Sequence, residues 1–130
     1  MTLVKFDELV HNVSLRPGMY TGSARYDVFV ALLEGYAWGL NEGSLEGLRP
    51  WLLMRSRSTA YNIVWPQLLL TAARGLEWSS LDSLTTDEHA ETIRLAGSIL
   101  REFLDHKSSV GLQSIEADFA RYMKKRAPRS

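Results

Sequence analysis

Histidine is the side chain most often used to move protons near neutral pH, and this chain of 130 residues has three, His11, His89 and His106. They lie in separate segments, and none stands at a recognisable spacing from a nucleophile or a second titratable group. His89 follows Glu88 in the first turn of an expected helix and His106 lies near that helix's end, so we expect both on the surface. The histidines give no support for acid–base catalysis, and we expect a protein that is not an enzyme.

Metal ligands on a helix stand three or four residues apart, a spacing shared here by Asp87 with Glu91 and by Glu102 with Asp105 or His106. Carboxylate pairs of this kind are common on solvated helices, so they are weak indicators of a metal. The chain has no cysteine, which excludes disulfides, thiolate zinc sites and cysteine nucleophiles. We therefore expect neither a metal site nor a cofactor.

The peptide over residues 16–22, Arg-Pro-Gly-Met-Tyr-Thr-Gly, is the most distinctive in the chain. Pro17 fixes φ for the first central position of a turn, and Gly18 can take the positive φ that a type II turn requires next. We therefore predict a type II turn between two helices, with Tyr20 packed as a lid over the core.

An anion-binding site is the chemical alternative for this region. Gly22 and Ser23 precede an expected helix, whose N-terminal N–H groups and dipole favour negative charge. Arg16 or Arg25 could add charged donors. The segment lacks the further glycines and the lysine of a phosphate loop, so this alternative rests on weak sequence signals.

Charge is balanced over the whole chain, with fifteen basic and fifteen acidic residues. A net charge of zero gives no general attraction to nucleic acid or to an anionic membrane, so we expect neither as a partner. Residues 77–105, however, contain seven carboxylates against two arginines, a net charge of −5. A basic protein surface is the natural complement of such a segment, although a solvated helix face can have the same composition.

Tryptophans are the second candidate feature for a binding surface, because they are enriched among interface anchors. Trp38 and Trp78 lie near an expected helix end and in an expected loop, whereas we expect Trp51 and Trp65 to be buried. The predicted partner-binding residues are Trp38, Glu77, Trp78, Asp82, Asp87, Glu88 and Glu91.

Apolar residues that recur every three or four positions predict the helices that must position these side chains. The predicted ranges are 3–13 with Thr2 as N-cap, 25–41, a short helix from 48 that fades near 55–58, 65–74, 86–106, and a last helix that starts after an N-cap at Ser108 or Ser109 and runs to about 125. No segment shows the alternation of a clear strand. The fold class is therefore all-α, a compact orthogonal bundle of five or six helices.

Local signals support several of these boundaries. Thr85 followed by Glu88 three residues later is a capping box, and a glycine in Asn41–Ser44 is expected to end the second helix in the left-handed conformation. Gly35 and Gly39 inside that helix each cost about 1 kcal/mol relative to alanine, so we expect another element to pack closely on them.

The segment between the fourth and fifth predicted helices reads as a loop. Its residues Trp78, Leu81 and Leu84 are expected to fill the core from outside. Residues 1–126 are therefore predicted to form a single helical domain, and residues 127–130 a flexible tail.

Two family resemblances bear on function. The peptide of residues 16–22 resembles one near the start of the ATPase domain of bacterial type II topoisomerase B subunits. That family needs a glutamate and an asparagine four residues apart, and later an Asp-Gly motif. Here Glu34 and Asn41 are seven residues apart and no Asp-Gly dipeptide occurs, so we exclude ATP hydrolysis.

A second resemblance extends over residues 2–106. The order of features in this range is similar to that of a small uncharacterised bacterial family. These features are the amphipathic first helix, the Arg-Pro-Gly-Met-Tyr-x-Gly turn, a helix with Leu32, Gly35 and Tyr36, and an acidic helix ending in Glu-Phe-Leu-Asp. Some members of that family resemble immunity proteins of toxins. The resemblance implies a cognate protein toxin as the partner.

These observations lead to one functional hypothesis and one alternative. We expect a cytoplasmic immunity protein that binds its toxin and occludes the active site through the acidic helical face. The chain begins without a leader-like segment, which is why we expect the cytoplasm. The alternative is a small regulatory domain for an anionic ligand or nucleotide, and a homodimer also stays open.

Overall fold

A long central helix organises the molecule. The computed structural model describes residues 4–21, 24–59 and 62–126, and this part of the chain is helical, without strands. The elements are α1 (Phe6–Leu15), α2 (Pro17–Thr21), α3 (Tyr26–Leu40), α4 (Leu48–Ser56), α5 (Trp65–Arg74), the 3-10 helix η1 (Trp78–Ser83), α6 (Thr86–Val110) and α7 (Leu112–Arg126). The all-α class is confirmed: all six predicted helices are present, and the short α2 and η1 are added to them.

The predicted capping box starts α6. Glu88 N–H donates to the Thr85 hydroxyl at 3.1 Å, and Thr85 N–H donates to the Glu88 carboxylate at 3.0 Å. The helix runs one turn further than predicted, so the proposed N-cap at Ser108 or Ser109 is wrong, because both lie inside α6. The break comes at Gly111, whose φ of 87° is a conformation that residues with a side chain rarely adopt.

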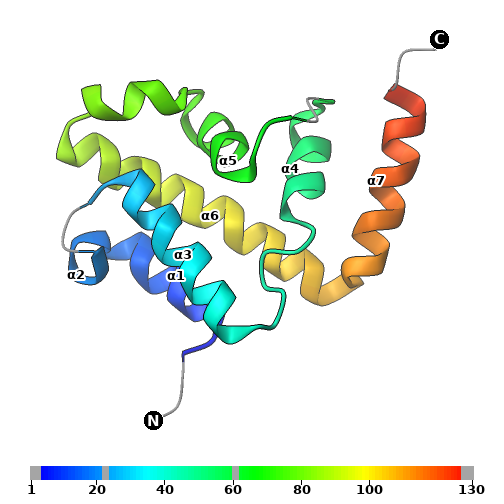
Figure 1. The fold of residues 1–130 in the computed structure, drawn as a ribbon, viewed down its shortest axis with the longest axis horizontal. Helices are drawn as coiled ribbons and strands as arrows, with labels where there is room; N and C mark the ends of the chain where they lie inside the picture. Colours follow the sequence, from blue (N-terminus) through cyan, green and yellow to red (C-terminus); the bar gives the residue numbers. More distant parts are fainter. Residues whose placement is uncertain (1–3, 22–23, 60–61, 127–130) are drawn as a thin grey trace.

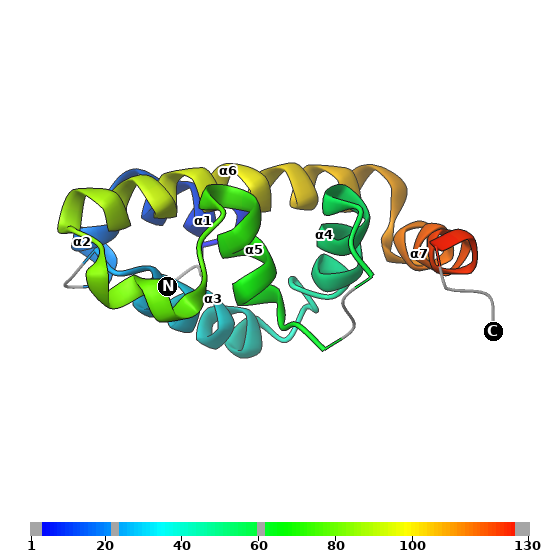
Figure 2. The same ribbon diagram turned by 90° about the horizontal axis from the view of Figure 1, so that it is seen from above.

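Helices from distant parts of the chain pack along α6. Figure 1 shows α6 crossing the length of the molecule, with α1 and α3 near one half and α4 and α7 near its C-terminal half. From above, α6 lies along one side, with α3 on the opposite side and α5 between them (Figure 2). The helices α1, α3, α5 and α7 all contact α6.

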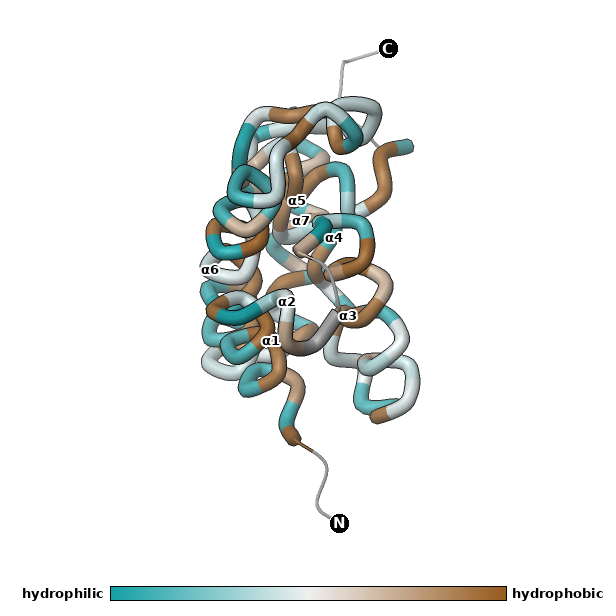
Figure 3. The backbone as a smooth tube through the Cα atoms, turned by 90° about the vertical axis from the view of Figure 1, so that its left-hand side faces the viewer, coloured by the Kyte–Doolittle hydropathy of each residue, from teal (hydrophilic) through white to brown (hydrophobic). Residues whose placement is uncertain are grey.

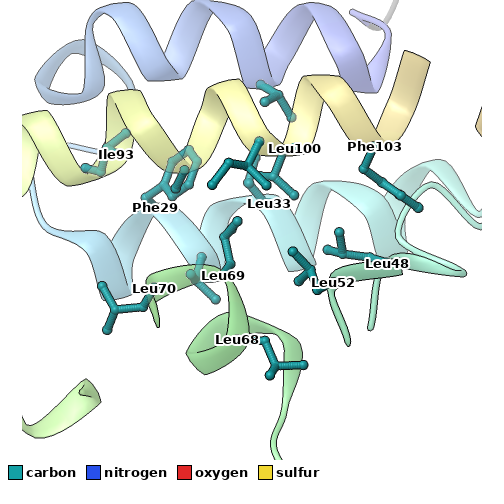
Figure 4. Packing of buried hydrophobic residues seen from close by; sticks show 14 of the residues in the cluster. Phe29, Leu33, Leu48, Leu52, Leu68, Leu69, Leu70, Ile93, Leu100 and Phe103 are labelled. Atoms are coloured by element: carbon teal, nitrogen blue, oxygen red, sulfur yellow. The ribbon is translucent and has the colours of Figure 1, made fainter. Parts of the chain in front are cut away.

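The core lies between these helices. Figure 4 shows leucines of α4 and α5 meeting side chains of α3 and α6. The large side chains that are almost completely buried are Tyr26, Phe29, Leu33, Leu48, Leu52, Leu53, Leu69, Leu70, Ile93, Leu100, Phe103 and Ile115. Hydrophobic and hydrophilic stretches alternate within single helices, as amphipathic helices require (Figure 3). Trp51 is buried as predicted, whereas Trp65 is only half-buried at the edge of the core.

The closest approach between two helices involves α1 and α6. A Cβ atom on Gly97 would lie 1.8 Å from Ser14 Oγ, a separation that real atoms do not allow. The buried Ser14 hydroxyl donates to the Val10 carbonyl of its own helix at 2.5 Å, so it needs no other partner. Only glycine at position 97 lets α1 lie this close to α6.

The predicted type II turn at residues 16–19 is wrong. Residues 17–21 form the short helix α2, and Gly18 is absent from the described residues that have positive φ. The φ that proline fixes also suits the first turn of a helix, so the Pro-Gly pair did not distinguish the two outcomes.

Two expectations about glycines in and after α3 are also wrong. Asn41, not a glycine, takes the left-handed conformation that ends α3, with φ of 53°. Gly35 and Gly39 are exposed, and a Cβ atom on either would meet nothing within 4 Å. No described element of this chain packs on them, so their cost in helix stability is not offset within the chain.

The last helix lies at one end of the molecule (Figures 1 and 2). It packs chiefly against α4 and the end of α6, and Ile115 is its one buried residue among those described. The Tyr122 hydroxyl donates to the Ser58 carbonyl at 2.8 Å and ties α7 to the segment after α4.

Some predictions fall outside what the structure describes, namely Thr2 as N-cap, the side chain of Tyr20 as a lid over the core, and residues 127–130 as a flexible tail. Within the described part, no helix combines the length and the apolar character needed to cross a membrane.

Candidate partner-binding site

His89, expected on the surface, is a buried structural residue with an exposed fraction of 3%. Its Nδ1 accepts a hydrogen bond from Tyr26 N–H at 3.1 Å, and its Nε2 lies 2.9 Å from the Leu81 carbonyl oxygen. With Nδ1 accepting, Nε2 carries the proton and donates to that carbonyl, so the ring is neutral. Nδ1 thus links α6 to the start of α3, and Nε2 links α6 to η1. The burial of His89 could have been predicted from its spacing, because it lies four and seven residues before Ile93 and Ala96, which are buried on the same face of α6.

The acidic segment of residues 77–105 is partly neutralised by arginines from elsewhere in the fold. Asp82 pairs with Arg25 at 2.8 Å and Glu102 with Arg55 at 3.4 Å, both across more than forty positions of sequence. These partners are not visible in a count of charges along one segment. The predicted acidic face therefore carries less uncompensated charge than its composition indicates.

Two more of its carboxylates are engaged within α6. Hydrogen bonds from Arg94 lower the pKa of Glu91, whose Oε2 lies 3.0 Å from Arg94 Nε. The backbone N–H of Thr85 lowers the pKa of Glu88 through the capping box. Asp87 and Glu77 are exposed. Among the predicted acidic partner-binding residues, Glu77, Asp87 and Glu88 make no ion pair in the described structure, and of these three only Glu88 is engaged, through the capping box.

The predicted anion site keeps only part of its donors. Arg25 donates from Nε to Asp27 at 3.0 Å and from a terminal nitrogen to Asp82 at 2.8 Å, and these two hydrogen bonds raise its pKa. Arg16 is exposed, while Gly22 and Ser23 lie outside the described residues. The anion site thus stays a prediction, with Arg25 directed toward carboxylates of its own chain.

Trp38 is the most exposed large apolar side chain of the described residues, at 86%. Trp78, also predicted at a partner surface, is 42% exposed and packs edge-on against the buried Tyr26, with 5.9 Å between ring centroids. Trp38 lies on the outer side of α3 with Glu34 one turn before it. Trp78 begins η1, which places it far from Trp38 in sequence.

Each tryptophan lines a surface hollow beside α3, and the two hollows have Glu34 in common. We call this pair of hollows the α3 groove. The first, of about 470 Å³, is lined chiefly by Ala31, Glu34, Val64, Pro66 and Trp78. The second, of about 570 Å³, is lined by Glu34, Ala37, Trp38, Asn41 and the loop 43–46. The lining residues of the two hollows thus extend along α3 from Asp27 to Asn41.

The groove is acidic and apolar. Asp27, Glu34 and Glu46 line it, and no lysine or arginine does so within the described structure. Asp27 is paired with Arg25. Lys107 donates to the Gly43 carbonyl at 2.6 Å behind the loop, where burial lowers its pKa and Glu46 partly opposes that shift. Glu34 makes no ion pair with any described residue, which leaves its charge uncompensated at the junction of the hollows.

Sequence reasoning found Trp38 and Trp78 but missed Glu34, Glu46 and Val64. Asp27, Ala31, Glu34 and Trp38 follow one helical stripe, which periodicity could have revealed. Val64 comes from another part of the chain, and only the fold brings it to α3.

A second, more polar hollow lies between α1 and α6. It has a volume of about 310 Å³ and is lined by Asp7, Glu8, His11, Asn12, Arg101 and Asp105. In the described part of the chain, no three His, Cys, Asp or Glu side chains are grouped so that they could hold a metal ion. This hollow offers polar contacts without a metal-binding cluster.

Comparisons of the chain with protein-family models, with curated proteins and with solved structures found no match. The resemblance to the bacterial family with the Arg-Pro-Gly-Met-Tyr-x-Gly peptide therefore stays a prediction.

Proposed function

We propose that this chain is a non-catalytic immunity protein, which binds a basic protein toxin in the cytoplasm and covers the toxin's active site. The observation that carries the proposal is Trp38, 86% exposed at the edge of a groove that contains carboxylates and no lining base among the described residues. The choice of a toxin as partner follows from the family resemblance in the sequence.

An exposed tryptophan favours binding because it can bury a large area in a partner. A tryptophan covers about 150–250 Å² in an interface, worth roughly 4–6 kcal/mol of transfer free energy before ordering losses. Tryptophans are accordingly enriched among the residues whose truncation costs a complex about 2 kcal/mol or more. Trp38 is held on the 15-residue helix α3, so little backbone ordering is needed on binding.

The acidic part of the surface proposed for binding differs from the one expected from sequence, whereas Trp38 and Trp78 belong to both. Arginines and the capping box engage several carboxylates of residues 77–105, whereas Glu34 in the α3 groove has no ion-pair partner among the described residues. A basic partner gains more from an uncompensated carboxylate than from one already paired. The α3 groove is therefore the better candidate for the contact surface.

The test is co-expression with the protein encoded immediately upstream. The chain should restore growth to cells that produce the C-terminal domain of that protein, and the two should copurify. Trp38→Ala should weaken both effects. Leu15→Ala is the matched control, because Leu15 is also an exposed apolar residue, at 61%, but does not line the groove. A harmless neighbour that forms no complex would contradict the proposal.

A further inference from the structure

The two hollows of the α3 groove differ in chemistry, and the difference indicates what each would bind. The hollow beside Trp78 is mainly apolar, with Ala31, Pro66 and Val64 in its wall. Val64 is 63% exposed, so its apolar side chain is available to a partner. Such a wall fits an aliphatic or aromatic side chain, since burying apolar surface on both sides removes it from water.

The hollow beside Trp38 fits a cation. Glu34 and Glu46 both line it, and Trp38 offers its indole ring next to them. A guanidinium or ammonium group is attracted both to carboxylates and to the face of a tryptophan ring. An anionic ligand such as a phosphate or a lipid headgroup would meet like charge here and be repelled.

From this arrangement we infer that the α3 groove binds a segment of a partner protein that places an apolar side chain beside Trp78 and an arginine or lysine between Trp38 and Glu34. The inference rests on the proposed function, to which it adds the chemistry of the partner. Charge complementarity selects this occupant, because Glu34 and Glu46 line the hollow beside Trp38 without an ion pair to any described residue, and no described lysine or arginine lines it.

The inference can be tested with two synthetic amphipathic peptides that share the same leucines. One carries lysine and arginine at its polar positions, and the other carries glutamate at the same positions. Each is titrated into the ¹⁵N-labelled full chain, and the indole N–H signals of its tryptophans are followed by NMR. The basic peptide should shift the signals of Trp38 and Trp78 and leave that of the buried Trp51 unchanged.

Variants identify the contacts. Trp38→Ala and Glu34→Gln should each weaken binding of the basic peptide by about tenfold, which corresponds to the loss of one good charged or aromatic contact. Glu116→Gln is the matched control, because Glu116 is an exposed glutamate on α7, outside the groove, and its removal should change nothing. Circular dichroism confirms that each variant is folded.

Three results would overturn the inference: no shift of Trp38 and Trp78 with the basic peptide, equal binding of the acidic peptide, or shifts of the same signals with protein concentration alone. The last would assign the groove to a second copy of this chain. Because the titration uses no toxin, the two proposals fail separately. Peptide binding without growth rescue contradicts toxin inhibition, and rescue without peptide binding contradicts only the inference about the groove.

Discussion

The same substitution, glycine to alanine, should have opposite effects at two positions of this fold. At Gly97 the new Cβ atom would lie 1.8 Å from Ser14 Oγ and 2.6 Å from Ser14 Cβ, whereas at Gly35 it would meet nothing within 4 Å. Carbon atoms in contact are normally about 3.5–4.0 Å apart. At position 97, therefore, α1 must move or Ser14 must leave its rotamer.

The magnitudes follow from these contacts. Overpacking costs about 1–3 kcal/mol, loss of the Ser14 hydrogen bond to Val10 adds about 1 kcal/mol, and helix propensity returns about 1 kcal/mol. Gly97→Ala should thus lower the free energy of unfolding by about 1–3 kcal/mol. Gly35→Ala should raise it by up to about 1 kcal/mol, because only the propensity applies there.

Urea unfolding followed by circular dichroism measures both effects. Adding Ser14→Gly to Gly97→Ala removes both clashing atoms and should recover stability relative to Gly97→Ala alone. Equal stability of the Gly97→Ala and Gly35→Ala proteins would refute the close contact between α1 and α6. Failure of the second substitution to compensate would show that Ser14 is not the source of the clash.

Three further effects should be measurable. His89→Ala leaves Tyr26 N–H and the Leu81 carbonyl without their partner, so the free energy of unfolding, measured by urea denaturation, should fall by about 2–4 kcal/mol. A loss below about 1 kcal/mol would contradict the two hydrogen bonds. Burial raises the pKa of Tyr26, whose hydroxyl donates to the Pro66 carbonyl at 2.7 Å, so its phenolate should form only when the protein unfolds at alkaline pH. This ionisation should give an absorbance step that Tyr26→Phe removes, and ionisation of every tyrosine while circular dichroism is still native would count against the burial of Tyr26. The Thr85 N–H lowers the pKa of Glu88 below its usual 4.5, so the carboxylate stabilises the fold above that pH, and this contribution disappears as the pH falls through the lowered pKa. Glu88→Gln should therefore flatten the acid dependence of the urea midpoint, and an unchanged slope would speak against the capping box.

The helices were predictable where a local signal fixed them. Apolar periodicity and Pro66 gave α5 its observed bounds, and Thr85 with Glu88 gave the start of α6. The Pro17-Gly18 pair was ambiguous, because proline suits both a turn and a first helical turn. The end of α6 was placed too early, since Ser108 and Ser109 can also be helical, and the decisive residue was Gly111.

The candidate site was less predictable because it depends on long-range contacts. Trp38 was recognised from its position near a helix end, but Val64 and Trp78 reach α3 only through the fold. The acidic segment was overrated for the same reason, since Arg25 neutralises Asp82 from a position 57 residues away. Single-sequence periodicity reports which side of a helix is apolar, not which charged side chain another helix supplies.

The position of α7 has a consequence for how the protein opens. Among the described residues, its support comes chiefly from α4, the end of α6, the buried Ile115, the partly buried Phe119 and the hydroxyl of Tyr122. Elements with few buried contacts open locally at lower free energy than the core. Amide protons of α7 should therefore exchange with solvent through a subglobal opening that leaves α1, α3 and most of α6 intact. That opening would also separate the protein into a persistent N-terminal unit and a detachable C-terminal helix, so a protease should remove α7 first.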